Sequence, residues 1–136
     1  ICNERELAFQ YERLNCINKA RRRELLRRLR RSTDFMHSNL QRKLSLTEIA
    51  RAACLSEYHY LRLFRQVFQM TPMSYLRAQR VQRAIALLHS SSTEIQEIAA
   101  QVGFTRLSLW RNVRRAIGEG PLKMRQRAGD CGSREQ

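Results

Sequence analysis

Apolar residues recur at intervals of three and four along most of this chain, which is the period of an amphipathic α-helix. One series begins at Leu25 and predicts a helix that covers residues 4–31 and continues to about Asn39. Later series predict further helices, and one over 72–89 would span about 27 Å. With 2 prolines and 5 glycines, the chain has too few turn residues for an all-β sandwich or barrel, so we expect an all-α fold.

Polar residues at the predicted helix ends supply the caps that helices need. Ser45 and Glu48 have the spacing of a capping box, which predicts that a helix starts there. Ser56 is suited to cap the following helix, and Thr71 precedes a proline at a first helical position. Gly118, which is followed closely by a proline, is typical of a helix end.

The chain contains an internal repeat with an offset of 49 residues. Leu46–Ala50 matches Ile95–Ala99, and the six residues after each segment also correspond. Each copy has Glu-Ile-Ala, three residues, a turn position, an apolar residue and then Ser or Thr. The alanine lets a second helix cross closely, the turn position favours a residue such as Gly103, and the hydroxyl caps the second helix. These features predict a helix-turn-helix in each copy.

The net charge of the chain indicates what kind of partner the two helix-turn-helix copies would bind. Lys and Arg number 26 against 12 Asp and Glu, so the net charge is +14. Composition alone leaves the anionic partner open between nucleic acid, a membrane surface and an acidic protein. Either copy alone could be purely structural. Two copies in one strongly basic chain favour double-stranded DNA as the partner, with the second helix of each copy in successive major grooves.

The two ends of the chain differ from its middle. We expect residues 1–33 to be a basic helical connector from a missing upstream domain, because the chain opens with Ile1 rather than methionine. The arginine-rich stretch 19–31 has either a solvated face or a face that contacts phosphates or an anionic membrane. We expect residues 128–136 to be a disordered tail, because apolar periodicity is lost there.

Between these ends, we expect residues 34–127 to form a double helix-turn-helix domain. Its units are predicted over about 45–68 and 94–118, joined by the long linker helix 72–89. Beyond the repeat itself, further residues within and between the two copies are informative through their order and spacing. They are Phe64, Arg65, Thr71, Pro72, Tyr75, Leu76, Arg77, Arg80, Arg83, Ala84, Leu87, Leu88, Ile98, Ala99, Gly103, Phe104, Ser108, Gly118 and Pro121.

In these residues the stretch from about 34 to 125 resembles the DNA-binding domain of the AraC/XylS family of transcription regulators. The resemblance covers about two-thirds of the chain. It implies about seven helices, with two helix-turn-helix subdomains joined by a long helix. The N-terminal basic helix is predicted in addition, from the residues themselves. It also implies RNA polymerase as a partner, an upstream sensor or dimerisation domain, and a bacterial regulator of the cytoplasm.

Four positions depart from the pattern of that family. Cys54 occupies a turn position where glycine is usual, and a strained turn there would cost about 1 kcal/mol. Gln69 replaces a common glycine before the Thr-Pro pair. Arg114 stands where the family has a core phenylalanine, and Met124 where it has tyrosine. We expect the arginine to extend out to solvent.

The recognition helices are expected at Ser56–Val67 and Thr105–Ile117, with their apolar sides in the core. Candidate base contacts are Tyr58, Leu61, Arg62, Arg106, Leu107, Ser108, Arg111 and Asn112. Arg62 and Arg111 are the strongest, because a guanidinium matches the acceptors of guanine. A phosphate contact or a solvated side chain is the alternative for each. Candidate phosphate contacts are Lys43, Ser56, Arg65, Thr105, Arg115 and Lys123.

Signals for other chemistry are weak. The 4 cysteines contain no C-x-x-C pair, so we expect no metal site, and Cys54 is predicted to be a buried free thiol in a reducing compartment. No phosphate-binding glycine loop or catalytic motif is present, so we expect no cofactor and no enzyme. No apolar run is long enough to span a membrane.

Two other functions stay open at this point. One is a non-specific or architectural nucleic-acid binder, although the recognition positions differ between the two copies. The other is a helical module that binds a membrane or a protein through residues 19–31.

Overall fold

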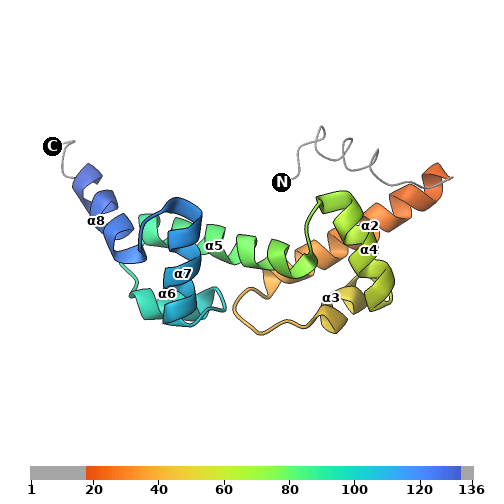
Figure 1. Cartoon of the computed structure of the whole chain (residues 1–136), viewed down its shortest axis with the longest axis horizontal. Coiled ribbons are helices and arrows are strands. Elements are labelled where there is room, and N and C mark those ends of the chain that lie inside the picture. The colour runs from red at the N-terminus through yellow and green to blue at the C-terminus, as the bar shows by residue number, and fades with distance from the viewer. Residues whose placement is uncertain (1–17, 133–136) are drawn as a thin grey trace. The chain divides into compact units, whose positions relative to one another are not determined.

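The computed structural model describes residues 18–132, and in this range all regular structure is helical, which confirms the predicted all-α class. The helices are α2 (Lys19–Ser38), α3 (Leu46–Ala52), α4 (Glu57–Phe68), α5 (Pro72–Ser90), α6 (Ile95–Gln101), α7 (Arg106–Ile117) and α8 (Pro121–Gly132) (Figure 1). The predicted helix over residues 4–17 lies outside the described residues.

The chain divides into two compact units. Described residues up to Asn39 join Leu44–Leu76 in the first unit, whereas Leu40–Lys43 join the residues from Arg77 onward in the second. Each unit therefore holds one helix-turn-helix, α3 with α4 in the first and α6 with α7 in the second. The long helix α5 begins in the first unit and continues into the second.

An aromatic cluster forms much of the core of the first unit. Phe64 is fully buried, and its ring stacks on Phe68 with centroids 4.3 Å apart and meets the edge of Tyr75 at 5.5 Å. The Tyr60 hydroxyl donates a hydrogen bond to Ser32 Oγ at 3.0 Å, which satisfies a polar group at full burial. Burial raises the pKa of Tyr60, so this bond is made by the neutral phenol.

The core of the second unit gathers the apolar sides of four helices. Its buried residues are Ala84, Leu88, Ile98, Ala99, Val102, Leu109, Val113 and Met124. Arg80 joins α5 to the short segment 40–43 of this unit, because its guanidinium donates to the backbone oxygens of Leu40 at 3.0 Å and Arg42 at 2.8 Å. Burial lowers the pKa of Arg80, and these two carbonyls are its hydrogen-bond acceptors.

The predicted disordered tail differs from the structure, because residues 128–132 continue helix α8. Pro121 begins this helix at a position that needs no N–H, and good helix formers follow it. Met124 anchors the helix in the core, and Arg125 donates to the Thr93 carbonyl. Sequence periodicity missed the helix because its buried side is short.

The predicted boundary between residues 33 and 34 falls inside a continuous helix. Helix α2 carries the arginine-rich stretch and also buries Leu25, Leu29, Thr33 and Met36. The apolar series that begins at Leu25 therefore belongs to the same folded unit as the first helix-turn-helix. A separate connector role for residues 1–33 stays a prediction.

The turns of the two repeat copies adopt the same left-handed backbone. Cys54 has a φ of 55° and Gly103, its counterpart, a φ of 76°. Cys54 is exposed, so the expectation of a buried thiol was wrong. The left-handed turn directs its side chain to solvent, and the apolar residue that follows, Leu55, is the half-buried one. Gln69 also has a left-handed backbone, with a φ of 59°, because it ends α4 at a position where glycine is common.

We expect Cys54→Gly to raise the free energy of unfolding by up to about 1 kcal/mol, because glycine adopts a positive φ without the steric cost of a Cβ. Urea denaturation followed by circular dichroism measures the change.

Gly103→Ala is the matched control for that substitution. A Cβ at Gly103 would clash with the Leu40 carbonyl oxygen and lie 3.0 Å from the Arg80 guanidinium, so stability should fall by about 1 kcal/mol or more. A Cys54→Gly protein that is less stable than the unmodified chain would show that the thiol side chain contributes more than the turn costs.

Candidate nucleic-acid interface

The first helix-turn-helix is held together by the caps that the sequence predicted. Ser45 Oγ accepts from the Glu48 amide at 3.2 Å, and the Glu48 carboxylate accepts from the Ser45 amide at 3.0 Å, which confirms the capping box. Ser56 Oγ accepts from the His59 amide at 3.3 Å and so caps α4. The Thr47 hydroxyl donates to the Glu57 carboxylate, which links the starts of α3 and α4.

The second helix-turn-helix repeats this arrangement with one difference. Thr105 Oγ1 accepts from the Ser108 amide at 3.1 Å and caps α7, as predicted. Helix α6 begins after Glu94, which makes no side-chain cap, so the capping box of the first copy has no equivalent in the second. Gly118 ends α7 in a left-handed conformation with its amide bonded to the Arg114 carbonyl at 2.8 Å.

Helix α4 has one buried and one exposed side, as its apolar pattern predicted. Tyr60, Leu63, Phe64 and Val67 are buried. The predicted contact residues lie elsewhere on the helix: Tyr58 is 76% exposed, Arg62 and Arg65 are exposed, and Leu61 is half-buried. The exposed side therefore combines an aromatic ring with two cations, which suits it to a polyanion with apolar base edges.

Helix α7 presents a more basic surface. Leu109 and Val113 are buried, whereas Arg106, Arg111 and Arg115 are exposed and Leu107 is 56% exposed. The predicted phosphate contacts Lys43 and Lys123 are exposed as well, and both belong to the second unit.

Two predicted base contacts on α7 are already engaged within the helix. The Asn112 amide donates to the Ser108 carbonyl at 2.8 Å, and Ser108 Oγ accepts from the Thr105 hydroxyl at 3.0 Å. Both side chains are half-buried. Each keeps donor or acceptor capacity for a base, but their partial burial makes them weaker candidates than the exposed Arg111.

Arg114 lies outside the core, as expected from its charge. Its guanidinium lies over the Trp110 ring, 4.9 Å from the centroid, and both side chains are exposed. At the position where the family pattern has a core phenylalanine, this chain thus has an exposed cation–π contact. Trp110 is 43% exposed and was not among the predicted contact residues.

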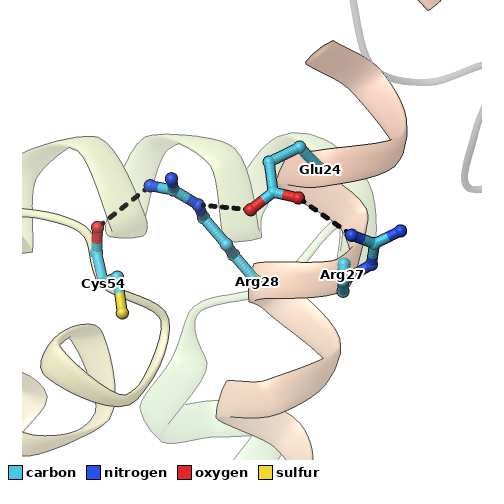
Figure 2. Close-up of polar contacts among 4 residues, drawn as sticks. All are labelled: Glu24, Arg27, Arg28 and Cys54. Atoms are coloured by element: carbon cyan, nitrogen blue, oxygen red, sulfur yellow. Dashed lines mark hydrogen bonds and ion pairs between the residues drawn. The ribbon is translucent and has the colours of Figure 1, made fainter. Parts of the chain in front are cut away.

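Sequence reasoning also missed Arg28. Its Nη1 donates to the Cys54 carbonyl oxygen at 3.2 Å, and its Nε donates to the Glu24 carboxylate at 3.1 Å (Figure 2). The other oxygen of Glu24 pairs with Arg27 at 3.2 Å. This arrangement ties α2 to the turn that precedes α4. No sequence signal indicated it, because 26 residues separate the partners.

Within residues 18–132, no cluster of three or more His, Cys, Asp or Glu side chains is placed to hold a metal ion. None of the described helices has the length and hydropathy needed to cross a membrane.

A comparison with protein families matches residues 49–127 to a helix-turn-helix domain family. One relative is the uncharacterized HTH-type transcriptional regulator YdeC of Bacillus subtilis, 30% identical over 81 residues, which is 60% of this chain and 28% of that protein. Another is the XylDLEGF operon transcriptional activator of Pseudomonas putida, 33% identical over 95 residues, 67% of this chain and 30% of that protein. The chain thus spans less than a third of the length of either relative.

Two solved structures are similar in fold. The DNA-binding domain of AdpA, in complex with a target DNA, has a TM-score of 0.70 at 28% identity, over 79% of this chain and 96% of that one. A regulator with an AraC-type DNA-binding domain from Chromobacterium violaceum has a TM-score of 0.70 at 26% identity, over 76% of this chain and 93% of that one.

We expect Thr105→Ala to destabilise the protein by about 1 kcal/mol, because the first turn of α7 loses the acceptor for the Ser108 amide. Thr105→Ser keeps that acceptor and serves as the control. Thermal and urea unfolding of the three proteins measure the difference, and an alanine variant as stable as the serine variant would contradict the capping role.

Proposed function

The chain belongs to the AraC/XylS family of helix-turn-helix transcription regulators, and we propose that it binds double-stranded DNA sequence-specifically, with α4 and α7 in successive major grooves. Family and fold are those of DNA-binding regulators and not of enzymes.

One observation carries this proposal: two repeat-related helices of 12 residues each have a buried apolar side and an exposed side rich in arginine. A major groove admits a helix of this kind, and exposed side chains near its N-terminus reach the base edges. The left-handed turn and the hydroxyl cap hold the start of each helix in place, so the side chains are positioned before DNA binds.

We assign base reading to Tyr58, Arg62, Arg106, Leu107 and Arg111, with Leu61, Ser108 and Asn112 in lesser roles. Exposure supports the first group, because those side chains have no core contact to give up. Phosphate contacts are assigned to Lys43, Ser56, Arg65, Thr105, Arg115 and Lys123. Of these, Thr105 donates to Ser108 Oγ, so its hydroxyl would have to turn toward a phosphate.

Selection from a library of random duplexes tests the proposal. A specific regulator enriches a defined sequence, whereas a non-specific binder enriches none. Specific reading is favoured because the exposed residues differ between copies, with Glu57 and Tyr58 at the start of α4 and Arg106 and Leu107 at the start of α7.

A membrane-bound role through residues 19–31 has less support. An interfacial helix places its apolar side in lipid, but α2 buries Leu25 and Leu29 in the first unit. Apart from Ala20, the exposed residues of 19–31 are all basic, and these suit DNA as well as a headgroup.

The resemblance to the family supports three further parts of the proposal. RNA polymerase is a proposed partner, in keeping with relatives that are named as activators. An upstream sensor or dimerisation domain and action in the bacterial cytoplasm are also proposed, and each stays a prediction.

We expect Arg62→Ala to cost about 1–3 kcal/mol on the selected duplex and to relax preference at one base pair. Arg65→Ala is the control on the same helix and should weaken all duplexes alike, with a log–log salt slope reduced by about 1. Fluorescence anisotropy at several salt concentrations measures both. Equal loss on all sequences for Arg62→Ala would place Arg62 on a phosphate.

We expect an insertion of about 5 bp between the two subsites to reduce affinity to near the non-specific level. The half turn moves one subsite to the opposite face of the duplex, and α5 passes without interruption from one unit into the other. An insertion of about 10 bp is the control for spacing without a change of face. Unchanged affinity after the half-turn insertion would show that only one unit reads DNA.

A further inference from the structure

We infer that the start of α2 also contacts DNA: Arg21 joins the Ser56 hydroxyl and the His59 imidazole in binding one backbone phosphate beside the first recognition helix. This inference rests on the proposed function, because it extends the DNA contact to the helix that precedes the first helix-turn-helix.

A pocket lies where α2 passes the turn before α4. Two segments that are far apart in the sequence line it, and its volume is about 370 Å³. The lining residues are Arg21, Glu24, Leu25, Arg28, Cys54, Leu55, Ser56 and His59. Arginine, hydroxyl and imidazole groups are the common partners of phosphate oxygens in DNA complexes.

The charged side chains that line this pocket are net positive, which favours the binding of an anion. Among the described residues that line it, Glu24 is the only acid, and that carboxylate accepts from Arg28 at 3.1 Å and from Arg27 at 3.2 Å (Figure 2). Arg28 is occupied further, since it donates to the Cys54 carbonyl at 3.2 Å. Arg21 is exposed, and no described residue pairs with its guanidinium.

The position of Ser56 relates the pocket to the proposed interface. Its oxygen accepts from the His59 amide, which leaves the hydroxyl proton free to be donated outward. Tyr58 and Arg62, the proposed base readers, follow on the same helix. A recognition helix that enters a groove places its first residues near the flanking backbone, so a phosphate is the anion available to this pocket.

Arg23 supplies a matched control on the same helix. It is exposed, carries the same charge and lies two residues after Arg21, which is about 200° around the helix. A general effect of charge would be lost equally in Arg21→Gln and Arg23→Gln, whereas a phosphate contact at the pocket depends on Arg21 alone.

The experiment measures binding of the full chain, of Arg21→Gln and of Arg23→Gln to the duplex recovered by selection. We expect Arg21→Gln to weaken binding about threefold to tenfold and to lower the magnitude of the salt slope by about 0.9, the value for one phosphate contact. Arg23→Gln should change affinity less than twofold. Single methylphosphonate substitutions along the duplex should include one that weakens the unmodified chain and leaves Arg21→Gln unaffected.

The outcomes separate this contact from the function on which it rests. If the unmodified chain enriches and binds a defined duplex but the two variants behave alike, the contact of α2 is wrong and the proposed function stands. If no duplex is enriched, the proposed function fails and the contact fails with it. Equal loss of affinity for anionic vesicles in both variants, without any change on DNA, would assign the arginines of α2 to a lipid surface and overturn the inference.

Discussion

The left-handed turn between two short helices is the constraint on which each half of this protein depends. At residues 54 and 103 the backbone takes a positive φ, and the chain can then place a second helix across the first at close range over Ala50 or Ala99. The apolar side of that second helix fills the core, and its polar side is left outside. Cap, burial and exposed surface all follow from this turn, which is why the repeat preserves it although one copy has cysteine where the other has glycine.

Local pattern was sufficient to predict much of this fold. The capping box at Ser45, the caps at Ser56 and Thr105 and the proline start of α5 are encoded within four residues of where they act, and the structure contains each of them. Buried positions on the recognition helices follow from the same helical period. Which exposed residues contact DNA is a different question, because exposure identifies candidates without saying what they touch.

The features that the sequence did not predict depend on contacts between distant segments. Arg28 bonds to the Cys54 carbonyl across 26 residues, and Met124 docks α8 into a core whose other members lie earlier in the chain. The apolar neighbours of Cys54 favoured a buried thiol, whereas its side chain is exposed at the left-handed turn. In each case the decisive term is tertiary geometry rather than periodicity.

Residues 40–43 limit how the two units of the chain could be separated. They belong to the second unit, although the residues on both sides of them belong to the first. Their backbone oxygens hold Arg80, and one of them lies against Gly103, so the second half is incomplete without this short segment. The two units are therefore interleaved along the chain, and no single cut in the backbone releases either one whole.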